Sequence, residues 1–387
     1  MQQLVDSIVA GGAFGKNPPR DLIDALFIFI FCAIVWLVVA FPFAGMVSWV
    51  ERRVWARIQS RVGPNRVGPN GFLQWIADGL KHVCKEDIVP EEADPHLFKF
   101  APYLFILAFA LPWAVMPFSE DLILADLNVG ILYFTAVTAI TVVGVLMAGW
   151  ASNDKWSLIG GIRSAAQIVS YEIPAGLSIF PVVLMTGTLS MQSIIKAQGW
   201  APQTWFLFAN PFTFIAANIL FISALAEGNR TPFDLPEAES ELVAGFATEY
   251  SGMRYLFFFM AEWGNLFIIG ALITTLFVGG WQFPRVTDNR VLMNVLQLIT
   301  FNVKVIAIVF SSMWIRATLP RVRVDQLMTM CWKYFVPIAF LNMIGTAVWV
   351  AIWPEGNPVA GWVMLGLGVI LAAVFLSRVI YYLRRSK

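Results

Sequence analysis

The sequence is poor in cysteine and histidine. Its three cysteines, Cys32, Cys84 and Cys331, lie far apart, and its only histidines are His82 and His96. No CxxC or His-rich spacing occurs, so the chain offers no recognisable ligand set for an iron–sulfur cluster, a haem or another metal. The usual dinucleotide and ATP motifs are also missing from the sequence. Any electrons in its chemistry are therefore expected to be carried by other proteins.

Charge is also scarce. Only 13% of the residues are Asp, Glu, Lys or Arg, and the net charge is +1. This balance offers no bulk attraction to nucleic acid. By contrast, 58% of the residues are hydrophobic, including 32 Phe and 16 Trp, and the mean hydropathy is +0.71. A soluble chain could not bury that much apolar surface, so the composition predicts a polytopic membrane protein.

Apolar runs long enough to cross a bilayer, about 20 residues, define the expected fold. They lie near 25–48, 98–117, 130–150, 164–187, 206–227, 254–279, 291–315, 333–353 and 359–382. We expect an all-α, polytopic transmembrane bundle of about nine helices, whose cytoplasmic loops contain amphipathic helices. Without repeats or linkers, residues 1–387 form one integral membrane domain. The first run, Ala25 to Val50, is too long for the apolar part of a cleavable signal.

Lysine and arginine are distributed unevenly between alternate loops. Loops 51–97, 151–163, 228–253 and 316–332, with the tail from Leu383, carry sixteen, and the opposite set carries five. The positive-inside rule places the basic set on the cytoplasmic side. The N-terminus is then expected outside and the C-terminus in the cytoplasm.

The first cytoplasmic loop combines basic residues with rigid turns. Arg52, Arg57 and Arg61 precede two Gly-Pro pairs, which force a turned connection. An apolar stripe at helical spacing follows and predicts a helix that lies along the membrane interface; it consists of Phe72, Ile76, Leu80 and Val83. A basic anchor that enforces topology is one interpretation. Because Asp78 and other polar groups are interleaved with the basic residues, a site for a headgroup with carbonyl oxygens, such as a quinone, is the other.

Three ionisable residues lie well inside apolar spans, namely Glu172, Glu262 and Lys304, and Glu227 ends another span. A structural ion pair between Lys304 and one glutamate would account for two of them. Three glutamates and a lysine on four helices exceed what one pair explains. Carboxyl groups at membrane depth commonly mark a proton or ion path.

An acidic loop, residues 227–245, separates two of these spans. Thr231 to Asp234 forms a capping-box pattern with Pro232 at the first helical position, which would give Asp234 a structural role. The loop also contains Glu237, Glu239, Glu241 and, just beyond it, Glu249. Glu237 and Glu241 are expected on one helix face, where like charges repel. The residues alone thus predict either a proton-translocating subunit or a cation-coupled transporter.

At these motifs the chain resembles a known family. Residues 71–86 and 232–245 look like the two signatures of the membrane subunit that anchors the quinone site in respiratory complex I. In bacteria it is called the H subunit, and in animals it is the first mitochondrially encoded subunit of NADH dehydrogenase. The Gly-Pro-Asn-Arg-Val-Gly-Pro loop and residues 261–263 and 314–321 are also similar. The resemblance covers about residues 20–350, and the last span, about 359–382, lies beyond the family's common core.

The resemblance implies a subunit of a proton-pumping NADH:quinone oxidoreductase, in the bacterial cytoplasmic (inner) membrane. Its substrate would be a quinone, ubiquinone or menaquinone, while FMN and the Fe–S clusters would lie in partner subunits. No catalytic activity is therefore expected from the isolated chain. Its partners would be the peripheral Fe–S and quinone-site subunits, the antiporter-like membrane subunits and the lipid bilayer, but not nucleic acid.

The resemblance also implies site residues. The quinone tunnel would involve Arg52, Arg57, Arg61 and Asp78. Proton coupling would involve Glu172, Glu227 and Glu262 in the membrane, and Asp234, Glu237, Glu239, Glu241 and Glu249 on the loop. Arg230 would pair with that loop.

Two other functions fit part of the pattern. The equivalent subunit of a membrane-bound hydrogenase or formate hydrogenlyase would share the acidic helices, but it would not need the arginine-rich loop and the intact first signature. A stand-alone ion-coupled transporter usually has inverted repeats and broken helices in matching halves, and neither is visible in the sequence.

Overall fold

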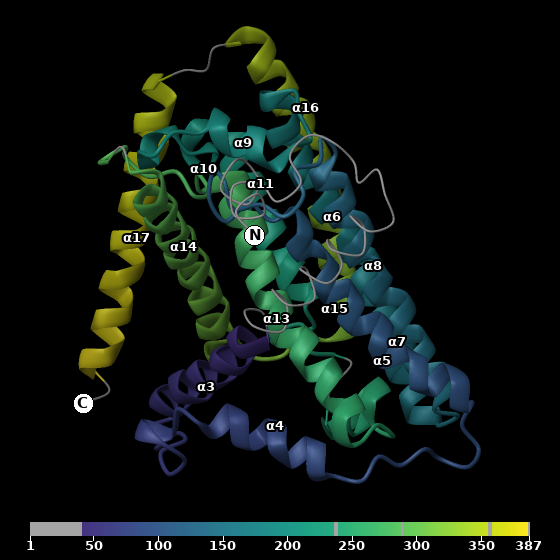
Figure 1. The fold of residues 1–387 in the computed structure, drawn as a ribbon. Coiled ribbons are helices and arrows are strands. Elements are labelled where there is room, and N and C mark those ends of the chain that lie inside the picture. Colours follow the sequence, from purple (N-terminus) through teal and green to yellow (C-terminus); the bar gives the residue numbers. More distant parts are fainter. Residues whose placement is uncertain (1–40, 236–238, 288, 355–357, 386–387) are drawn as a thin grey trace, which may run out of the picture.

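The computed structural model describes residues 41–235, 239–287, 289–354 and 358–385, and these ranges form helices and connecting loops without a strand. Six of the helical segments are long and apolar enough to cross a membrane. They run side by side through most of the molecule (Figure 1). The predicted all-α membrane bundle is confirmed.

The six segments correspond to six of the predicted spans. They are α5 with the short helix η3 (Pro95–Val115), α6 with α7 (Gly130–Ala151), α8 (Lys155–Thr186), α13 (Gly252–Phe277), α14 (Arg290–Thr318), and α15 with η6 and α16 (Val324–Ile352). Two shorter apolar helices are α11 (Pro211–Glu227) and part of α17 (Pro358–Arg385). Most of the first predicted span lies outside the described residues, which resume with α3 (Phe41–Ile58). The count of nine spans stays a prediction.

Two of the predicted spans are interrupted. The predicted span 206–227 is divided into α10 (Phe206–Ala209) and α11. Asn210 caps α11, because its side chain accepts a hydrogen bond from the Thr213 N–H at 2.7 Å. The predicted span 130–150 is divided at Ala139 into α6 (Gly130–Thr138) and α7 (Ile140–Ala151). Mid-membrane breaks are tolerated where protein or a wet cavity satisfies the backbone.

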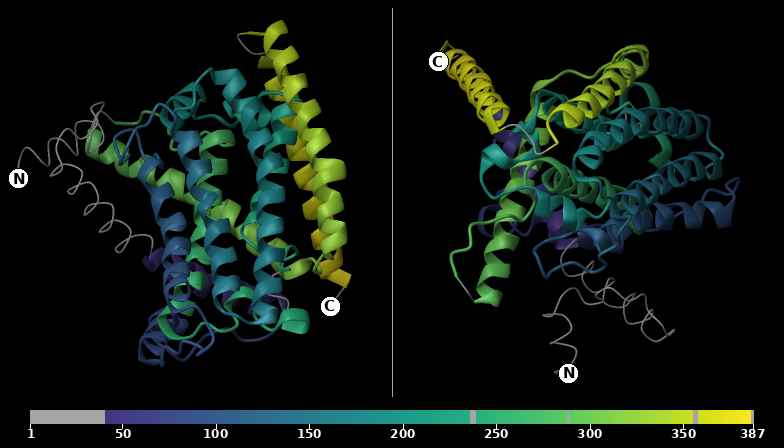
Figure 2. Two further views of the ribbon diagram at one scale, coloured as in Figure 1. Left: turned by 90° about the vertical axis from the view of Figure 1, so that its right-hand side faces the viewer. Right: turned by 90° about the horizontal axis from the view of Figure 1, so that it is seen from above.

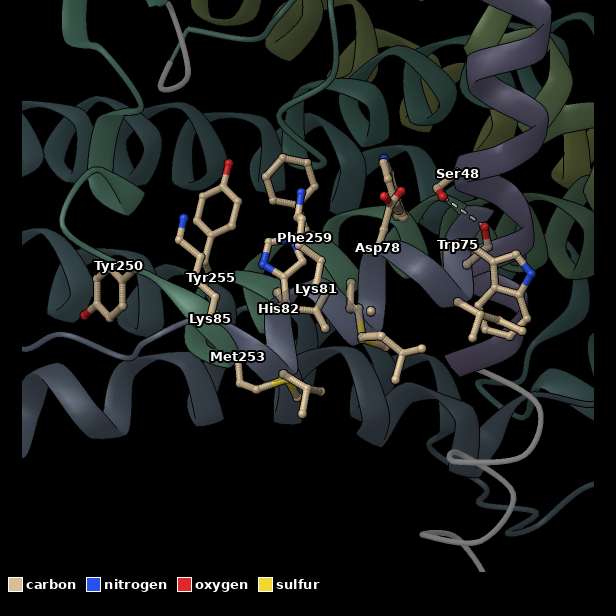
Figure 3. A pocket seen from close by; sticks show the side chains of 18 of the residues that line it. Ser48, Trp75, Asp78, Lys81, His82, Lys85, Tyr250, Met253, Tyr255 and Phe259 are labelled. Carbon is tan, nitrogen blue, oxygen red and sulfur yellow. Dashed lines mark hydrogen bonds between the residues drawn. The ribbon is translucent and has the colours of Figure 1, made fainter. Parts of the chain in front are cut away.

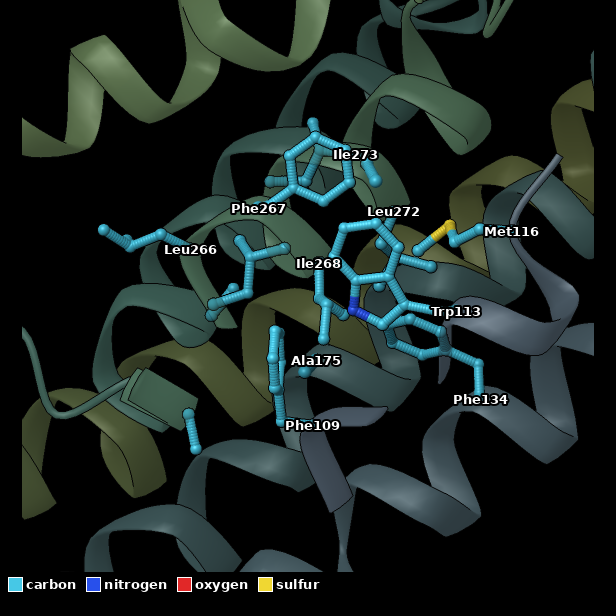
Figure 4. Packing of buried hydrophobic residues seen from close by; sticks show 14 of the residues in the cluster. Phe109, Trp113, Met116, Phe134, Ala175, Leu266, Phe267, Ile268, Leu272 and Ile273 are labelled. Atoms are coloured by element: carbon cyan, nitrogen blue, oxygen red, sulfur yellow. The ribbon is translucent and has the colours of Figure 1, made fainter. Parts of the chain in front are cut away.

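The long helix α8 packs against α7, α11 and α16. The largest apolar core lies beside it and is rich in aromatic rings, as Figure 4 shows around Trp113, Phe109 and Phe267. The Trp113 and Phe267 rings stack with centroids 4.8 Å apart. Such an aromatic pair adds about 0.5–1.5 kcal/mol beyond the burial of its surface. This core fixes the helices that carry the intramembrane acids.

Short helices and loops lie across the two ends of the bundle. At one end, α4 (Gln74–Cys84) crosses below α3 and α13, and at the other end lie α9 (Met191–Ala197) and α10 (Figure 1). None of the α4 residues is fully buried. The helix predicted after Phe72 is therefore present, while its position at the membrane interface stays a prediction. Its apolar stripe faces away from the protein core, since Leu80 and Val83 are about 60% exposed.

The C-terminal helix α17 lies at the edge of the molecule (Figure 2). It contacts the bundle through α10 and the short helix η4 (Pro202–Thr204). Gly368 lies against the Phe208 ring, so a Cβ there would be 2.9 Å from that ring. Among its described side chains, Val363, Leu367 and Ile370 are exposed. This arrangement agrees with the prediction of a peripheral helix that faces lipid or a partner.

Candidate functional site

A cavity of about 720 Å³ lies between α3, α4 and the first half of α13. Figure 3 shows its labelled side chains, which come from these three helices and from the loop before α13. Aromatic and aliphatic side chains form much of the wall, including Trp75, Leu256, Phe259 and Trp263. Ligand pockets typically enclose about 300–1,000 Å³ with few polar groups on an apolar wall. The cavity is therefore large enough for a small organic molecule.

Arg52 and Asp78 form the main polar contact in this wall. The Arg52 guanidinium donates a hydrogen bond to the Asp78 carboxylate at 2.5 Å, and the Gln74 amide donates another at 3.1 Å. The guanidinium also lies over the Trp263 ring, 5.8 Å from its centroid. The structure thus brings both predicted residues to the cavity. An anchored guanidinium can donate to a carbonyl oxygen placed beside it.

Arg57 and Arg61, the other two predicted tunnel residues, do not line the cavity. Arg57 is in the last turn of α3 and is exposed. Arg61 is also exposed, and its Nε donates to Gln59 Oε1 at 2.7 Å. The helix α3 ends at Ile58 and the chain turns away, so these two arginines are presented on the surface.

His82 lines the cavity but was given no role by sequence reasoning. Its ring is 5.9 Å from that of Tyr255, and it belongs to the same cavity wall as Lys81 and Lys85. Burial, together with the charges of these two lysines, lowers the pKa of His82 below its ordinary value of 6.5. It is therefore neutral at pH 7. No group of three or more potential metal ligands occurs among the described residues.

A buried charge cluster lies directly behind the cavity. Glu51, next to Arg52 in α3, is 4% exposed and contacts the guanidinium groups of Arg230, at 3.3 Å, and of Arg316. Arg316 also lies over the Trp55 ring, 4.7 Å from its centroid. Sequence reasoning missed this cluster, although Arg316 is inside the quoted motif 314–321. Because Arg230 begins the acidic loop, Glu51 joins the cavity helix to that loop.

The first half of the acidic loop is fixed to α8. The Gln167 side chain donates to the carbonyl oxygens of Ala226 and Phe233, both at 2.7 Å. The Asn229 amide donates to Ser164 Oγ at 3.2 Å. Both carbonyl oxygens also accept backbone N–H groups, from Asn229 and Leu235, so the α8 side chains are additional anchors. They hold the first half of the loop against α8.

The predicted capping box at residues 231–234 is wrong. Residues 231–235 form turns and extended backbone, and the next helix, α12, is Glu239–Leu242. Asp234 instead pairs with Arg321 at 3.2 Å, while the Val322 N–H donates to Pro232 O at 2.9 Å. Long-range contacts with the segment after α14 therefore override the local helix signal. Asp234 is an ion-pair residue here, not a helix cap.

The later acids of the loop are less buried. Glu241 is exposed and pairs with Arg163 of α8 at 2.7 Å. Glu239 begins α12, and Glu249 is partly buried just before α13. Glu237 lies outside the described residues, so its expected repulsion with Glu241 and the pairing of Arg230 with this part of the loop stay predictions.

The intramembrane glutamates lie near one another. Glu227, at the end of α11, and Glu262 of α13 line one small cavity of about 20 Å³. Glu172 of α8 is close enough to Glu227 for the two carboxylates to repel each other. Glu172 Oε1 is buried without a hydrogen-bond partner in the described part of the chain. The three predicted residues thus lie near one another on three helices, and their role in proton coupling stays a prediction.

Lys304 does not join this series. Its ammonium group donates to the Gly280 carbonyl oxygen at 2.9 Å and lies 4.8 Å from the centroid of the Trp205 ring. These contacts occur just beyond the C-terminal end of α13, where carbonyl oxygens and the helix dipole favour a cation. Among the described residues, Lys304 therefore does not form the ion pair with a glutamate that the sequence offered as one alternative.

Comparisons with known proteins give a consistent result. Residues 30–347 match the family model described as NADH dehydrogenase. The chain is 50% identical over 351 residues to the H subunit of the NADH-quinone oxidoreductase of Anaeromyxobacter dehalogenans, covering 86% of this chain and 85% of the relative. It is 44% identical over 359 residues to the same-named protein of Dehalococcoides mccartyi, covering 92% and 95%. It is 48% identical over 321 residues to that of Brevibacillus brevis, covering 83% and 92%.

Proposed function

Because the chain belongs to the NADH dehydrogenase family, we propose that it is the membrane-embedded H subunit of a proton-pumping NADH-quinone oxidoreductase, respiratory complex I. In this role it forms the membrane part of the quinone tunnel. It also couples quinone reduction to proton translocation through its buried carboxylates. The observation that carries the proposal is the cavity beside Arg52 and Asp78, with the Glu51 cluster directly behind it.

The cavity wall suits a quinone. Trp75, Leu256 and Phe259 can contact the apolar ring and the first part of an isoprenoid tail. The Arg52 guanidinium can donate to a quinone carbonyl oxygen, and its bond to Asp78 holds it in place. Of the four residues assigned to the tunnel, Arg52 and Asp78 contact the quinone in this proposal. Arg57 and Arg61 act from the surface, where peripheral subunits would dock.

The Glu51 cluster supplies the connection to the membrane acids. Arg52 and Glu51 are adjacent in α3, one lining the cavity and the other holding Arg230 and Arg316. A change of charge at the quinone alters the field at Arg52 and shifts the balance within this cluster. Arg230 begins the loop that leads back to Glu227 at the end of α11. The coupled acids are Glu227, Glu262, Glu172, Asp234, Glu237, Glu239, Glu241 and Glu249.

In this proposal the redox cofactors and the antiporter-like subunits of the complex lie in other chains. FMN and Fe–S clusters in peripheral subunits would bring electrons from NADH to the quinone, since the sequence has no ligand set for them. Antiporter-like membrane subunits would carry out further translocation. The location we propose is the bacterial inner membrane, with the N-terminus outside and the basic C-terminal tail in the cytoplasm.

The experiment is purification of the intact complex through a tag on this chain, followed by NADH:quinone reductase assays. We expect co-purified Fe–S subunits and reduction that a quinone-site inhibitor abolishes. Co-purification with a nickel–iron subunit and hydrogen-dependent activity would favour a hydrogenase instead. Ion transport by the purified chain alone, without partners, would favour a transporter.

A further inference from the structure

We propose that Thr141 and Asn265 position a single water molecule between Glu227 and Glu262, through which these two carboxyl groups exchange a proton. The proposal rests on the proposed function, because it concerns the same series of acids. In the exchange, one carboxyl group gives its proton to the water as the water gives one of its own to the other carboxylate. Bonds and charge balance, and the water is regenerated.

The cavity between the two glutamates has the size of one water molecule. Its volume is about 20 Å³, and a water site needs at least about 10–15 Å³ of space for its centre together with two to four polar partners. Glu227, Glu262, Thr138, Thr141, Asn229 and Asn265 line it. An apolar cavity of this size would stay dry, but this lining offers several polar partners. The cavity is therefore built for a water.

The third predicted span is interrupted directly beside this cavity. α6 ends at Thr138 and α7 begins at Ile140, and Thr138 and Thr141 both line the cavity. The Ala139 N–H donates to Thr135 O at 3.3 Å, and the Val142 N–H donates to Ala139 O at 3.1 Å, three residues back. Ala139 itself keeps right-handed helical dihedral angles (φ −59°, ψ −23°), so the interruption is a tightened helical turn. This turn brings Thr138 and Thr141 to the same cavity.

Thr141 and Asn265 are available to bind it. Thr138 and Thr135 donate their hydroxyl groups to helix carbonyl oxygens. In the described part of the chain, no protein group forms a hydrogen bond with the Thr141 hydroxyl or the Asn265 side-chain amide. A hydroxyl group in an apolar helix normally bonds back to its own backbone. Because the Thr141 hydroxyl makes no such bond here, it can both donate a hydrogen bond to the water and accept one from it.

The apolar part of the cavity lining restricts where the water can form hydrogen bonds. It is formed by Phe105, Ala108, Phe109 and Ala261. Phe109 is held against Gly264, where a Cβ would be only 2.1 Å from the ring. Because this wall has no polar side chain, the water's bonds are directed toward the carboxyl groups, the hydroxyl and the amide. A proton can then leave the water only toward one of the two acids.

The test uses the whole complex in sealed membrane vesicles, with proton uptake and NADH oxidation measured together in H₂O and in D₂O. We expect Thr141→Val and Asn265→Leu to lower the rate of proton uptake about tenfold, the factor that one lost hydrogen bond is worth, and to change its solvent isotope effect. Thr141→Ser should restore both values. The matched control is Thr135→Val, which lies on the adjoining helix α6 and outside the cavity.

The outcomes separate the two proposals. Unchanged uptake and isotope effect in Thr141→Val and Asn265→Leu, together with impaired Glu227→Gln, would overturn the water site and leave the proposed function standing. Unchanged activity in Glu227→Gln would overturn the proposed function itself. If the amount of assembled Thr141→Val complex is too low for assay, Thr141→Ala decides, because it removes the hydroxyl without adding bulk.

Discussion

The two cavities differ in the kind of occupant that each can hold. The one beside α4 measures about 720 Å³ and is lined mainly by aromatic and aliphatic side chains with one ion pair. The one between Glu227 and Glu262 measures about 20 Å³, and about half of its lining residues are polar. Size and polarity therefore separate a site for an organic substrate from a site for a proton carrier. In the proposed function, quinone binding and proton transfer would therefore use two separate cavities of the same bundle.

Charged side chains on α3 and α8 would connect the two cavities in the proposed function. α3 carries Arg52 toward the large cavity and Glu51 toward Arg230 and Arg316. α8 holds the acidic loop through Gln167, and it also carries Glu172. Single substitutions can weaken this connection without touching either cavity, and others can alter the cavities themselves.

The largest effect is expected from Glu51→Ala. This change leaves the guanidinium groups of Arg230 and Arg316 close together without their shared carboxylate. Removing one partner of a buried ion pair costs about 3–5 kcal/mol, so we expect little assembled complex in the membrane. The measurement is the amount of complex on a native gel. Asp325→Ala is the matched control, because the Arg323–Asp325 pair is more than 70% exposed and worth about 0–1 kcal/mol. Equal losses in both variants would refute this view of Glu51.

Gly160→Ala tests the contact between α8 and the acidic loop. A Cβ at Gly160 would be 2.7 Å from the backbone of Gly245, which cannot rotate away as a side chain could. Overpacking of this kind costs about 1–3 kcal/mol, so the loop should shift and proton uptake should fall more than quinone binding does. Protease accessibility of the loop and the KM for quinone measure the two effects. Gly176→Ala, on the same helix with no atom within 4 Å, should behave as wild type.

Asp78→Asn acts on the large cavity. It removes the charge that holds Arg52, and both side chains are partly exposed. A pair of this kind is worth about 0.2–1 kcal/mol, so the KM for quinone should rise about two- to fivefold with less change in kcat. Arg57→Gln should leave the KM unchanged, since Arg57 does not line the cavity. A larger rise in the KM for quinone in Arg57→Gln than in Asp78→Asn would contradict the assignment of Asp78 to the quinone cavity.

The smallest effect is expected from the pH dependence of His82. Because the pKa of this residue in the folded chain lies below 6.5, mainly through burial and the nearby Lys81 and Lys85, folding favours its neutral form. The stabilising contribution of neutral His82 to this wall is fully present above pH 6.5 and decreases as the pH falls toward the lowered pKa. The KM for quinone should therefore rise between pH 7.5 and 5.5. The rise should be smaller in His82→Asn; an identical rise would assign it to another group.

Much of the fold follows from apolar run length, because a helix that crosses a bilayer needs about 20 apolar residues. The amphipathic pattern after Phe72 also predicted α4. Local patterns were misleading where distant groups compete. The capping box at 231–234 does not form, since Asp234 pairs with Arg321, 87 residues further along the chain. The break at Ala139 carries no proline or glycine signal.

The candidate site, like the fold, could be predicted only in part from the sequence. The identity of the acids could be predicted, because glutamates are rare in apolar spans. Their partners could not. Glu51 contacts Arg316 across 265 residues, and nothing in the neighbouring sequence indicates which of many arginines it binds. A pair of Lys304 with a glutamate was one alternative on charge alone, but the carbonyl oxygen of Gly280 and the Trp205 ring lie beside Lys304 instead.

The central claim is that buried carboxyl groups couple quinone reduction to proton translocation. Its most direct test measures inhibitor-sensitive quinone reduction and proton uptake in vesicles that contain Glu172→Gln, Glu227→Gln or Glu262→Gln, each assembled to the wild-type level. We expect proton uptake to fall at least about tenfold in the Glu227 and Glu262 variants, a small part of what a positioned acid or base contributes. Quinone reduction and proton uptake that remain intact in all three variants would contradict the account.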